Sequence, residues 1–247
     1  MARYFLEVAY KGTRYSGFQV QENAVTIQSE VTNALSTIER CPVLLTGSSR
    51  TDAGVHALQN FFHFDSDGPL NPQLVYKMNA LLPPDIVVRN LYPVRDTAHS
   101  RFDALHREYE YRIYRYKNPF LRETGFFYPY KLDLGKLREA SRLVSGQTNF
   151  FAFAKTNTQV RNFTCTIYKS EWREEGEELV HEIVANRFLR GMVRLLTATM
   201  LKVGRGTLSM EGLEGSFVEN PPKCSFSIPS TGLFLKRVVY PENFFGD

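Results

Sequence analysis

The chain alternates hydrophobic and polar residues in several short stretches, and in others its hydrophobic residues recur with a helical period. Alternation is typical of a strand with one buried face, and a period near 3.6 residues is typical of an amphipathic helix. In the N-terminal part of the chain these patterns predict the order β-α-β-β-α-β. The predicted strands are residues 2–10, 43–49, 58–65 and 86–94, and the predicted helices are residues 27–40 and a segment entered near residue 71. Thr26 is a typical N-cap for the first helix, and Asn71-Pro72 is a typical start for the second.

The same order of elements begins again after Asp96. The predicted strands are residues 106–117, 166–173, 179–185 and 232–239, and the predicted helices are residues 133–145 and 188–203. A repeated order without repeated sequence predicts an α+β protein of two ferredoxin-like halves, each a split βαβ unit like an RNA-recognition motif. We expect their antiparallel sheets to form a central sheet, with a cleft between the halves. The expected subdomains are residues 1–100 and 101–247, and the loop-rich segments 118–130, 146–161 and 206–230 are expected at the rim.

Composition adds only weak constraints on function. The chain has 247 residues, 30 basic and 26 acidic, for a formal net charge of +4, which is compatible with an anionic partner but does not require one. Its three cysteines lie far apart and form no CxxC pair, so neither a disulfide framework nor a thiolate zinc site is predicted. The first residues alternate like a strand and lack the apolar core of a signal peptide, so we expect a soluble, cytoplasmic protein.

The segment GSSRTDAGVHA, residues 47–57, joins a cation, a carboxylate and a glycine between two predicted strands. A glycine-bearing turn at the end of a strand can present a side chain at the edge of a sheet. Taken alone, the pattern has two interpretations. Asp52 is either a functional carboxylate or the cap of an ordinary turn, and Arg50 is either a ligand contact or a solvated charge.

An aromatic strand follows the midpoint of the chain. Alternation over residues 107–117 places Tyr109, Tyr111 and Ile113 on one face of this strand. Such a face can stack on a nucleobase, but aromatic strands more often pack into a core, where a tyrosine needs only a partner for its hydroxyl.

Four arginines follow one stripe of the helix predicted at residues 188–203. A rotation of about 100° per residue brings Arg187, Arg190, Arg194 and Arg205 together, opposite an apolar face. The stripe fits a track for phosphates and, equally well, the solvated face of an amphipathic helix. The five histidines show no metal-ligand spacing, and no phosphate-binding glycine motif is present, so we expect neither a metal nor a nucleotide cofactor.

Residues 50–57, RTDAGVHA, resemble the signature of TruA-type tRNA pseudouridine synthases. Other segments resemble the same family in the same order: YKGTRYSGFQ at 10–19, TIQSEVTNAL at 26–35, RFDA at 101–104, REYEY at 107–111, FLRGMVR at 188–194 and GLFL at 232–235. The resemblance therefore covers nearly the whole chain. Departures are small, with Phe18 where the family more often has Trp, and Ser48-Ser49 where smaller residues are commoner.

The resemblance implies an isomerase that converts uridine to pseudouridine and a role for several residues. Asp52 is expected to be the catalytic nucleophile or base, Arg194 to pair with and orient it, and Tyr109 to lie against the target base, while Tyr111 is expected in the core. Arg50, Arg187 and Arg190 are the expected RNA contacts. Two assignments are weaker: Leu233 as part of the wall around the base, and His56 as a structural residue of the loop or an RNA contact.

The resemblance also implies the substrate and the assembly. It points to a homodimer that grips the anticodon arm and elbow of tRNA and modifies uridines just 3′ of the anticodon, at tRNA positions 38, 39 or 40. The uridine must leave the stack to be reached, and an aromatic ring such as that of Tyr109 would offset part of the unstacking cost. Two other hypotheses remain open: a non-catalytic RNA-binding module, and a related synthase that acts on other tRNA positions or another RNA.

Overall fold

The computed structural model describes residues 1–155 and 160–246. Part of the predicted rim loop at 146–161 therefore lies outside the described residues. The chain forms two compact units, one of residues 1–105 and 234–247 and the other of residues 106–233. Within the described ranges, no helix combines the length and apolar content that crossing a lipid bilayer requires.

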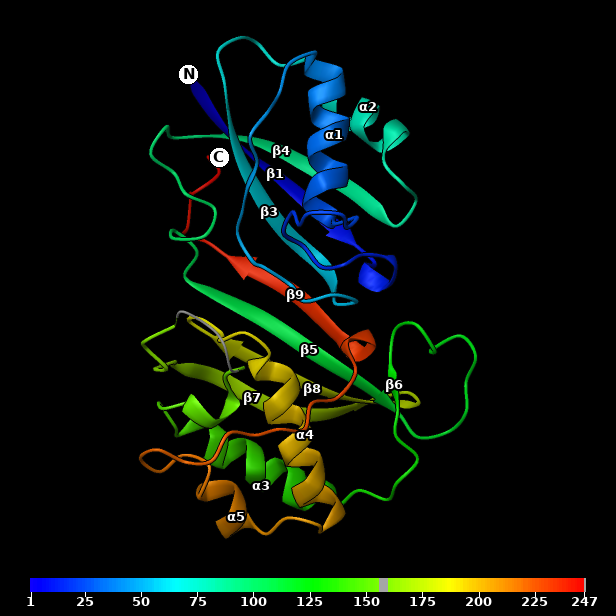
Figure 1. Cartoon of the computed structure of the whole chain (residues 1–247), viewed down its shortest axis with the longest axis vertical. Helices are drawn as coiled ribbons and strands as arrows, with labels where there is room; N and C mark the ends of the chain where they lie inside the picture. The colour runs from blue at the N-terminus through cyan, green and yellow to red at the C-terminus, as the bar shows by residue number, and fades with distance from the viewer. Residues whose placement is uncertain (156–159, 247) are drawn as a thin grey trace. The chain divides into compact units, whose positions relative to one another are not determined.

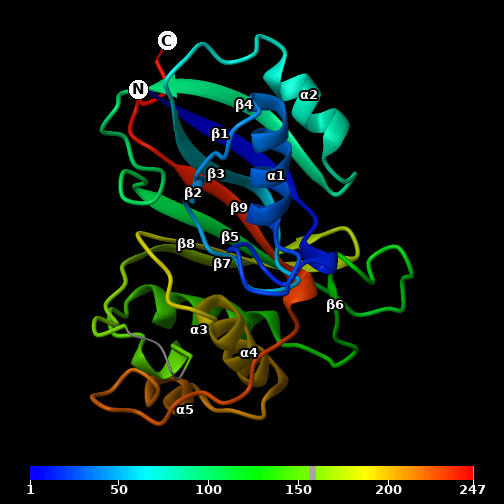
Figure 2. The ribbon, with the colours of Figure 1, turned by 45° about the horizontal axis from the view of Figure 1, so that its top comes forward.

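The first unit is a sheet with two helices on one face. Strand β1 (Ala2–Tyr10) pairs antiparallel with both β3 (His56–Ser66) and β4 (Ile86–Val94), and the short β2 (Thr46–Gly47) adds to β3. Strand β9 (Leu233–Val239) joins β3 in parallel, with His56 opposite Phe234. Helices α1 (Ile27–Glu39) and α2 (Leu74–Leu81) lie over one face of this sheet (Figures 1 and 2).

Helix α1 begins where the sequence predicts. The Thr26 side chain accepts a hydrogen bond from the Ser29 backbone N–H, and the Ser29 side chain accepts one from the Thr26 N–H, so a complete capping box forms. The helix ends at Arg40, whose φ of 57° is left-handed. Its buried residues are spaced by three and four positions, as an amphipathic helix on a sheet requires: Ile27, Val31, Ala34 and Leu35.

Aromatic side chains fill the core on the other face of the sheet. Phe5 of β1 and Phe61 of β3 lie on this face, and Tyr240 meets both rings at centroid distances of 5.5 and 5.2 Å. Phe245 packs on Phe61 at 5.5 Å. The grouping therefore differs from the boundary expected near residue 100, because residues 234–247 pair and pack with the first unit.

The second unit is a smaller antiparallel sheet with its own helices. Strand β8 (Glu178–Ala185) pairs antiparallel with β5 (His106–Tyr114) and β7 (Ile167–Glu175), and β6 (Phe126–Phe127) joins β5 in parallel. Helices α3 (Leu134–Ser145), α4 (Met192–Arg205) and α5 (Met210–Glu214) complete this unit (Figure 1). Asp133 caps α3 by accepting a hydrogen bond from the Lys136 N–H.

Four predicted segments differ from the structure. The strand expected at residues 43–49 is reduced to the two residues of β2. The helix expected from residue 188 begins only at Met192, because Gly191 adopts a left-handed conformation with φ 75° and interrupts the helical path. The segments expected to be loops at 118–130 and 206–230 contain β6 and α5, each too short to show a period in the sequence.

Candidate functional site

Asp52 lies in a tight turn between β2 and β3 of the first unit. The Val55 N–H donates to the Asp52 carbonyl at 3.2 Å, and Gly54, at the third position of the turn, has a left-handed φ of 77°. A positive φ at that position is the conformation that glycine adopts without strain. The Asp52 side chain is half-buried, so it stands at the surface of a loop whose backbone is fixed.

A buried set of hydrogen bonds holds this loop against the sheet. The hydroxyls of Tyr10 and Thr51 are 2.8 Å apart, and the Asn60 amide donates to the Tyr10 hydroxyl at 3.2 Å and to the Ser49 carbonyl at 2.9 Å. Burial raises the pKa of Tyr10 to about 12, so its hydroxyl keeps its proton near neutral pH. Thr51, the residue next to Asp52, is thus held by the buried Tyr10 hydroxyl, which is in turn fixed by the buried Asn60 amide.

The other side of the loop packs closely against the backbone at Gly12. A Cβ on Gly12 would lie 2.0 Å from the Val55 carbonyl oxygen, so only glycine fits there. The Gly12 N–H donates to His56 Nδ1 at 3.1 Å, and the His56 ring stacks on Phe234 with centroids 4.5 Å apart. His56 is 1% exposed, a placement that favours the structural interpretation of this residue over a direct RNA contact.

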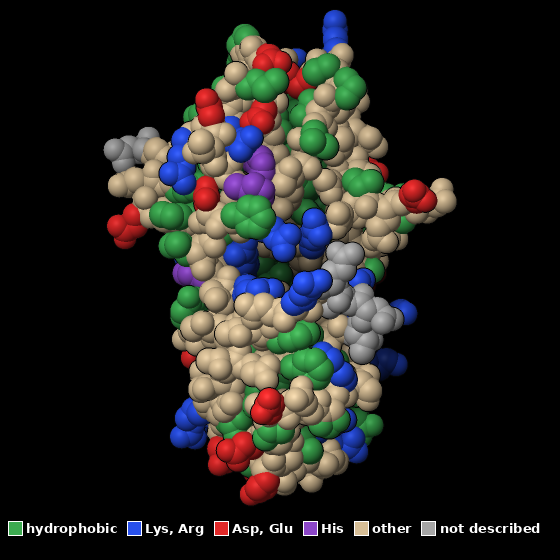
Figure 3. Space-filling view, turned by 60° about the vertical axis from the view of Figure 1, so that its left-hand side comes forward, with side chains coloured by type: hydrophobic (Ala, Val, Ile, Leu, Met, Phe, Trp, Pro, Cys, Tyr) green, Lys and Arg blue, Asp and Glu red, His purple; other side chains and the backbone are tan. Residues whose placement is uncertain are grey.

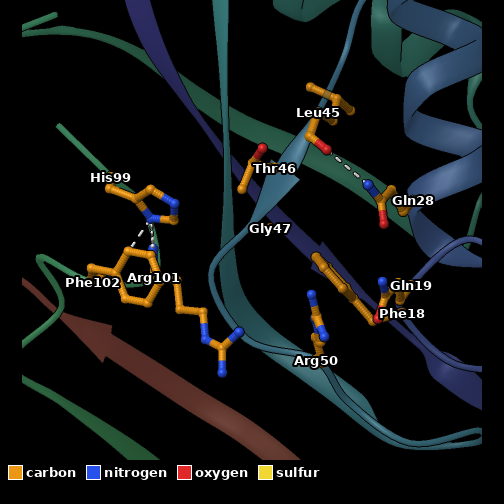
Figure 4. Close-up of a pocket in the computed structure, with 10 residues that line it drawn as sticks. All are labelled: Phe18, Gln19, Gln28, Leu45, Thr46, Gly47, Arg50, His99, Arg101 and Phe102. Atoms are coloured by element: carbon orange, nitrogen blue, oxygen red, sulfur yellow. Dashed lines mark hydrogen bonds between the residues drawn. The ribbon is translucent and has the colours of Figure 1, made fainter. Parts of the chain in front are cut away.

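A pocket of about 290 Å³ opens beside the loop, and we call it the Arg50 pocket (Figure 4). Four of the segments that carry the family resemblance contribute to its lining, through Gln19, Gln28, Arg50, Arg101 and Phe102. Figure 4 shows Arg50 beside Phe18 on one side of the pocket and Arg101 with Phe102 on the other. The pocket therefore combines two guanidinium groups, two amides and aromatic rings, which are groups that bind phosphates and nucleobases.

The RFDA segment forms the second side of this pocket because His99 fixes its backbone. His99 Nδ1 accepts hydrogen bonds from the N–H groups of Arg101 and Phe102 at 3.1 and 3.4 Å. Burial lowers the pKa of His99, which keeps the ring neutral and able to accept. The Phe102 ring lies 4.2 Å from the His99 ring and is 74% exposed. Figure 3 shows, on one face of the molecule, His side chains with hydrophobic and Lys or Arg side chains next to them.

In the second unit, β5 carries the two tyrosines singled out by the sequence. Tyr111 is fully buried and donates from its hydroxyl to the Pro229 carbonyl at 2.6 Å, which confirms its expected place in the core. Tyr109 is half-buried, and its ring meets Phe188 edge-on with centroids 5.0 Å apart. Its position is therefore fixed while part of the ring remains at the surface.

The four arginines expected on one helix are divided between two environments. Arg187 and Arg190 precede α4, so the predicted continuous stripe does not exist. Arg194, in the first turn of α4, is half-buried and donates from Nε to the Ile228 carbonyl at 2.8 Å. Arg205, at the end of α4, lies over the ring of Tyr130, 3.7 Å from its centroid. Leu233, at the start of β9, is 6% exposed.

The structure adds site residues that the patterns in the sequence did not single out. Arg101, Phe102, Gln19 and Gln28 belong to segments that resemble the family, but no pattern of their own marks them as site residues. The signal available in the sequence was an Arg-Phe pair next to His99, in a stretch with neither helical nor strand periodicity. Among the residues described, no group of three or more His, Cys, Asp or Glu side chains could hold a metal ion.

Known proteins resemble this chain over its full length. A family model described as tRNA pseudouridine synthase matches residues 140–241. The tRNA pseudouridine synthase A of Parabacteroides distasonis is 40% identical over 99% of this chain and 98% of its own length. The proteins of that name from Bacteroides thetaiotaomicron and Bacillus licheniformis are 42% and 40% identical, over 100% and 94% of this chain and 94% and 97% of their own lengths. Because such identity extends over both units, the chain belongs to the tRNA pseudouridine synthase A family.

Proposed function

We propose that Asp52 acts on the ribose of the target uridine as nucleophile or base. The chain is an isomerase that converts uridine to pseudouridine in tRNA, and Asp52 would carry out this reaction. The observation that carries the proposal is the loop itself. Three buried side chains and two glycines fix the backbone around Asp52, whereas Asp52 itself is only half-buried and follows two residues after Arg50, which lines the cationic pocket. An ordinary turn cap needs no such support.

The chemistry requires one carboxylate and no external atom. The bond from N1 of uracil to C1′ of the ribose breaks, the uracil turns within its site, and a new bond forms from C5 to C1′, while the proton on C5 is finally transferred to N1. Asp52 can serve in two ways. It either attacks C1′ and forms an ester that the uracil later displaces, or it removes a proton from C2′ to give a glycal that is reprotonated there.

Two residues of the second unit complete the proposed centre. We assign Arg194 to hold and orient the Asp52 carboxylate, since Arg194 lies in the first turn of α4 and its Nε donates to the Ile228 carbonyl, which positions the guanidinium. We assign Tyr109 to stack on the target uracil, because Phe188 holds its ring on edge and leaves a part of it exposed. Leu233 would contribute to the hydrophobic wall around the base.

The RNA contacts follow from the charges around these residues. We propose that Arg50 and Arg101 bind the RNA backbone next to the extruded uridine, and that Arg187 and Arg190 bind it from the segment that precedes α4. The target would be a uridine in the anticodon stem-loop, at tRNA positions 38 to 40. A homodimer that holds the anticodon arm and the elbow would carry a formal charge of +8 from two chains of +4, and its affinity should fall steeply with salt.

The finer architecture and location are also proposals. In the first unit, the element order β-α-β-β-α-β and the strand order β4-β1-β3-β2 support a ferredoxin-like split βαβ half. We propose the same plan for the C-terminal half, from residue 101 on. We also propose that the protein acts in the cytoplasm, because its substrate is tRNA. No cofactor enters the proposed reaction.

The decisive experiment replaces the carboxylate and maps pseudouridine by position. Unmodified tRNA is incubated with wild type, Asp52→Asn or Asp67→Asn, the last a control at an exposed aspartate of the same unit. Carbodiimide-dependent primer extension then locates each pseudouridine. We expect stops in the anticodon stem-loop with wild type and the control, none with Asp52→Asn, and tRNA affinity changed by less than about 1 kcal/mol, since the carboxylate acts on the sugar. Substantial turnover by Asp52→Asn would overturn the role of Asp52.

A substrate deuterated at C2′ separates the two routes. Proton removal at C2′ breaks the C–H bond in the reaction, so that route predicts a primary isotope effect on single-turnover rates. Attack at C1′ leaves this bond intact and predicts a rate close to that of the unlabelled substrate. Wild-type protein that binds tRNA but yields no new stops would instead be a non-catalytic RNA-binding module.

A further inference from the structure

A second pocket, of about 430 Å³, lies in the second unit along the C-terminal half of α4, and we call it the aromatic pocket. Its floor is apolar, formed by Ala198 and Leu201 of α4 and by Ile228, all at most 1% exposed. Its sides come from the segment after β6, residues 128–130, and from Phe226. All of these residues belong to one unit, so the pocket is complete within it.

Three aromatic rings on the walls of this pocket are partly exposed. Phe127, Tyr130 and Phe226 are 42%, 45% and 53% exposed. Tyr130 is held on edge against Tyr128, with ring centroids 5.0 Å apart, so its position is fixed although nearly half of its surface is exposed. Fixed aromatic faces at the surface are the usual platform for nucleobases, because every base can stack on them.

Two cations lie over these rings. Arg205 Cζ is 3.7 Å from the Tyr130 centroid, and Lys202 Nζ is 5.2 Å from the Phe226 centroid. No Asp or Glu is among the residues that line the pocket, and in the described part of the chain neither cation forms an ion pair. By contrast, Arg173 on β7 of the same unit is paired with Glu110 and Glu182 at 3.2 and 2.7 Å.

We propose that the aromatic pocket binds an unpaired nucleotide of the RNA substrate, with its base on the rings of Tyr130 and Phe226 and its phosphate on Lys202 and Arg205. A nucleotide matches both features of the site, because it joins a flat apolar ring to an anion. An acidic peptide would use the cations but not the exposed rings. The inference rests on the proposed function for the identity of the RNA as tRNA.

The position of the pocket on α4 relates this nucleotide to the reacting one. Arg194, Ala198, Leu201 and Arg205 follow one face of the helix at intervals of three and four residues, and Ile228, on the pocket floor, accepts the hydrogen bond from Arg194. With a rise of about 1.5 Å per residue, about 16 Å of helix separate Arg194 from Arg205. The bound nucleotide would therefore lie near the target uridine in the RNA, where it can influence which uridine is chosen.

The test separates stacking from charge by the salt dependence of tRNA binding. Fluorescein-labelled unmodified tRNA is titrated with wild type, Tyr130→Leu, Phe226→Leu and Arg205→Gln at several salt concentrations, with anisotropy as the readout. Loss of a ring should weaken binding about tenfold without changing the slope of log affinity against log salt. Loss of Arg205 should also reduce the slope, by about 0.7 for a single-stranded contact.

Matched controls are Tyr116→Leu and Arg138→Gln, an exposed ring and an exposed cation of the same unit that do not line the pocket. Both should bind tRNA like wild type, and all variants should keep the wild-type unfolding temperature. The proposal is overturned if the pocket variants bind within twofold of wild type, or if they change only the sedimentation of the protein, which would mean that a second copy of the chain covers the pocket. The two proposals can fail separately. If the wild-type protein forms no pseudouridine but the pocket variants still bind tRNA more weakly than wild type, the proposed function is wrong and the pocket remains an RNA-binding site.

Discussion

His181 makes the second unit sensitive to acid. Its ring lies in β8 with no exposed surface, between the hydroxyls of Thr197 and Ser170, each 3.0 Å from a ring nitrogen. The Trp172 ring stacks on it at 4.8 Å. Burial lowers the pKa of His181 to about 3, because a charged imidazolium would lose its hydration, and Glu182 offsets only part of this effect.

The sign and size of the effect follow from proton binding. In the unfolded chain the imidazole has a pKa near 6.5, so between about pH 6.5 and 3 the unfolded state binds a proton that the folded state excludes. Stability is therefore fully present above this range and is lost as the pH falls. At pH 5, about 1.5 pH units below the unfolded pKa, the loss is about 2 kcal/mol. Carboxylates with lowered pKa, such as Asp65, lose their contribution only at still lower pH.

Urea unfolding followed by fluorescence measures this loss, because Trp172 is the single tryptophan of the chain and lies against His181. We compare pH 7 and pH 5 for wild type, His181→Gln and His106→Gln, a control at a partly exposed histidine of the same unit. His181→Gln should be less stable at pH 7 by about 1 to 3 kcal/mol, since a buried hydroxyl loses its partner. Between the two pH values it should lose about 2 kcal/mol less than wild type does. Equal losses in wild type and His181→Gln would refute the reasoning.

Three further predictions concern the loop and the RNA contacts. Tyr10→Phe removes the hydroxyl next to Thr51 and should lower the free energy of unfolding by about 1 to 3 kcal/mol; kcat should fall more than KM rises, as single-turnover and steady-state rates will show. Arg101→Gln should weaken tRNA binding and reduce its salt slope by about 0.7 to 0.9, whereas an unchanged slope would exclude a phosphate contact. Replacing both Arg187 and Arg190 by Ala should reduce the salt slope of tRNA binding more than Arg101→Gln does. If the double variant has the same salt slope as wild type, the two arginines are ordinary surface charges.

The elements that the sequence predicts well are those determined by neighbouring residues. Strands β1 and β4 have the predicted bounds, since their alternation matches a sheet with two distinct faces. The start of α1 is also local, because Thr26 and Ser29 form the capping box themselves. Strand β8 shows the limit of this reasoning. All but one of its residues are buried, including His181 and Glu182, because partners on other elements satisfy their polar groups.

The start of α4 and the two pockets depend on information that periodicity lacks. Apolar residues continue from Phe188 into the helix, so the pattern has no break where the left-handed Gly191 interrupts the backbone. The Arg50 pocket joins residues from Phe18 to Phe102, which are brought together only by the sheet. The family resemblance marked these segments as important, but their convergence on one pocket is a property of the tertiary structure.

The placement of cations reconciles a modest net charge with a polyanionic substrate. In each unit a cation lies near an exposed ring: Arg101 Cζ is 5.7 Å from the Phe102 centroid, and Arg205 Cζ is 3.7 Å from that of Tyr130. Unpaired nucleotides offer both an anion and a flat base to such a pair, whereas duplex RNA offers mainly the anion. Cations spread evenly over the surface would bind paired and unpaired RNA alike, and the affinity would depend only on salt concentration. Cations beside rings favour extruded or looped nucleotides, which is the state that a uridine must reach before its glycosidic bond can be attacked.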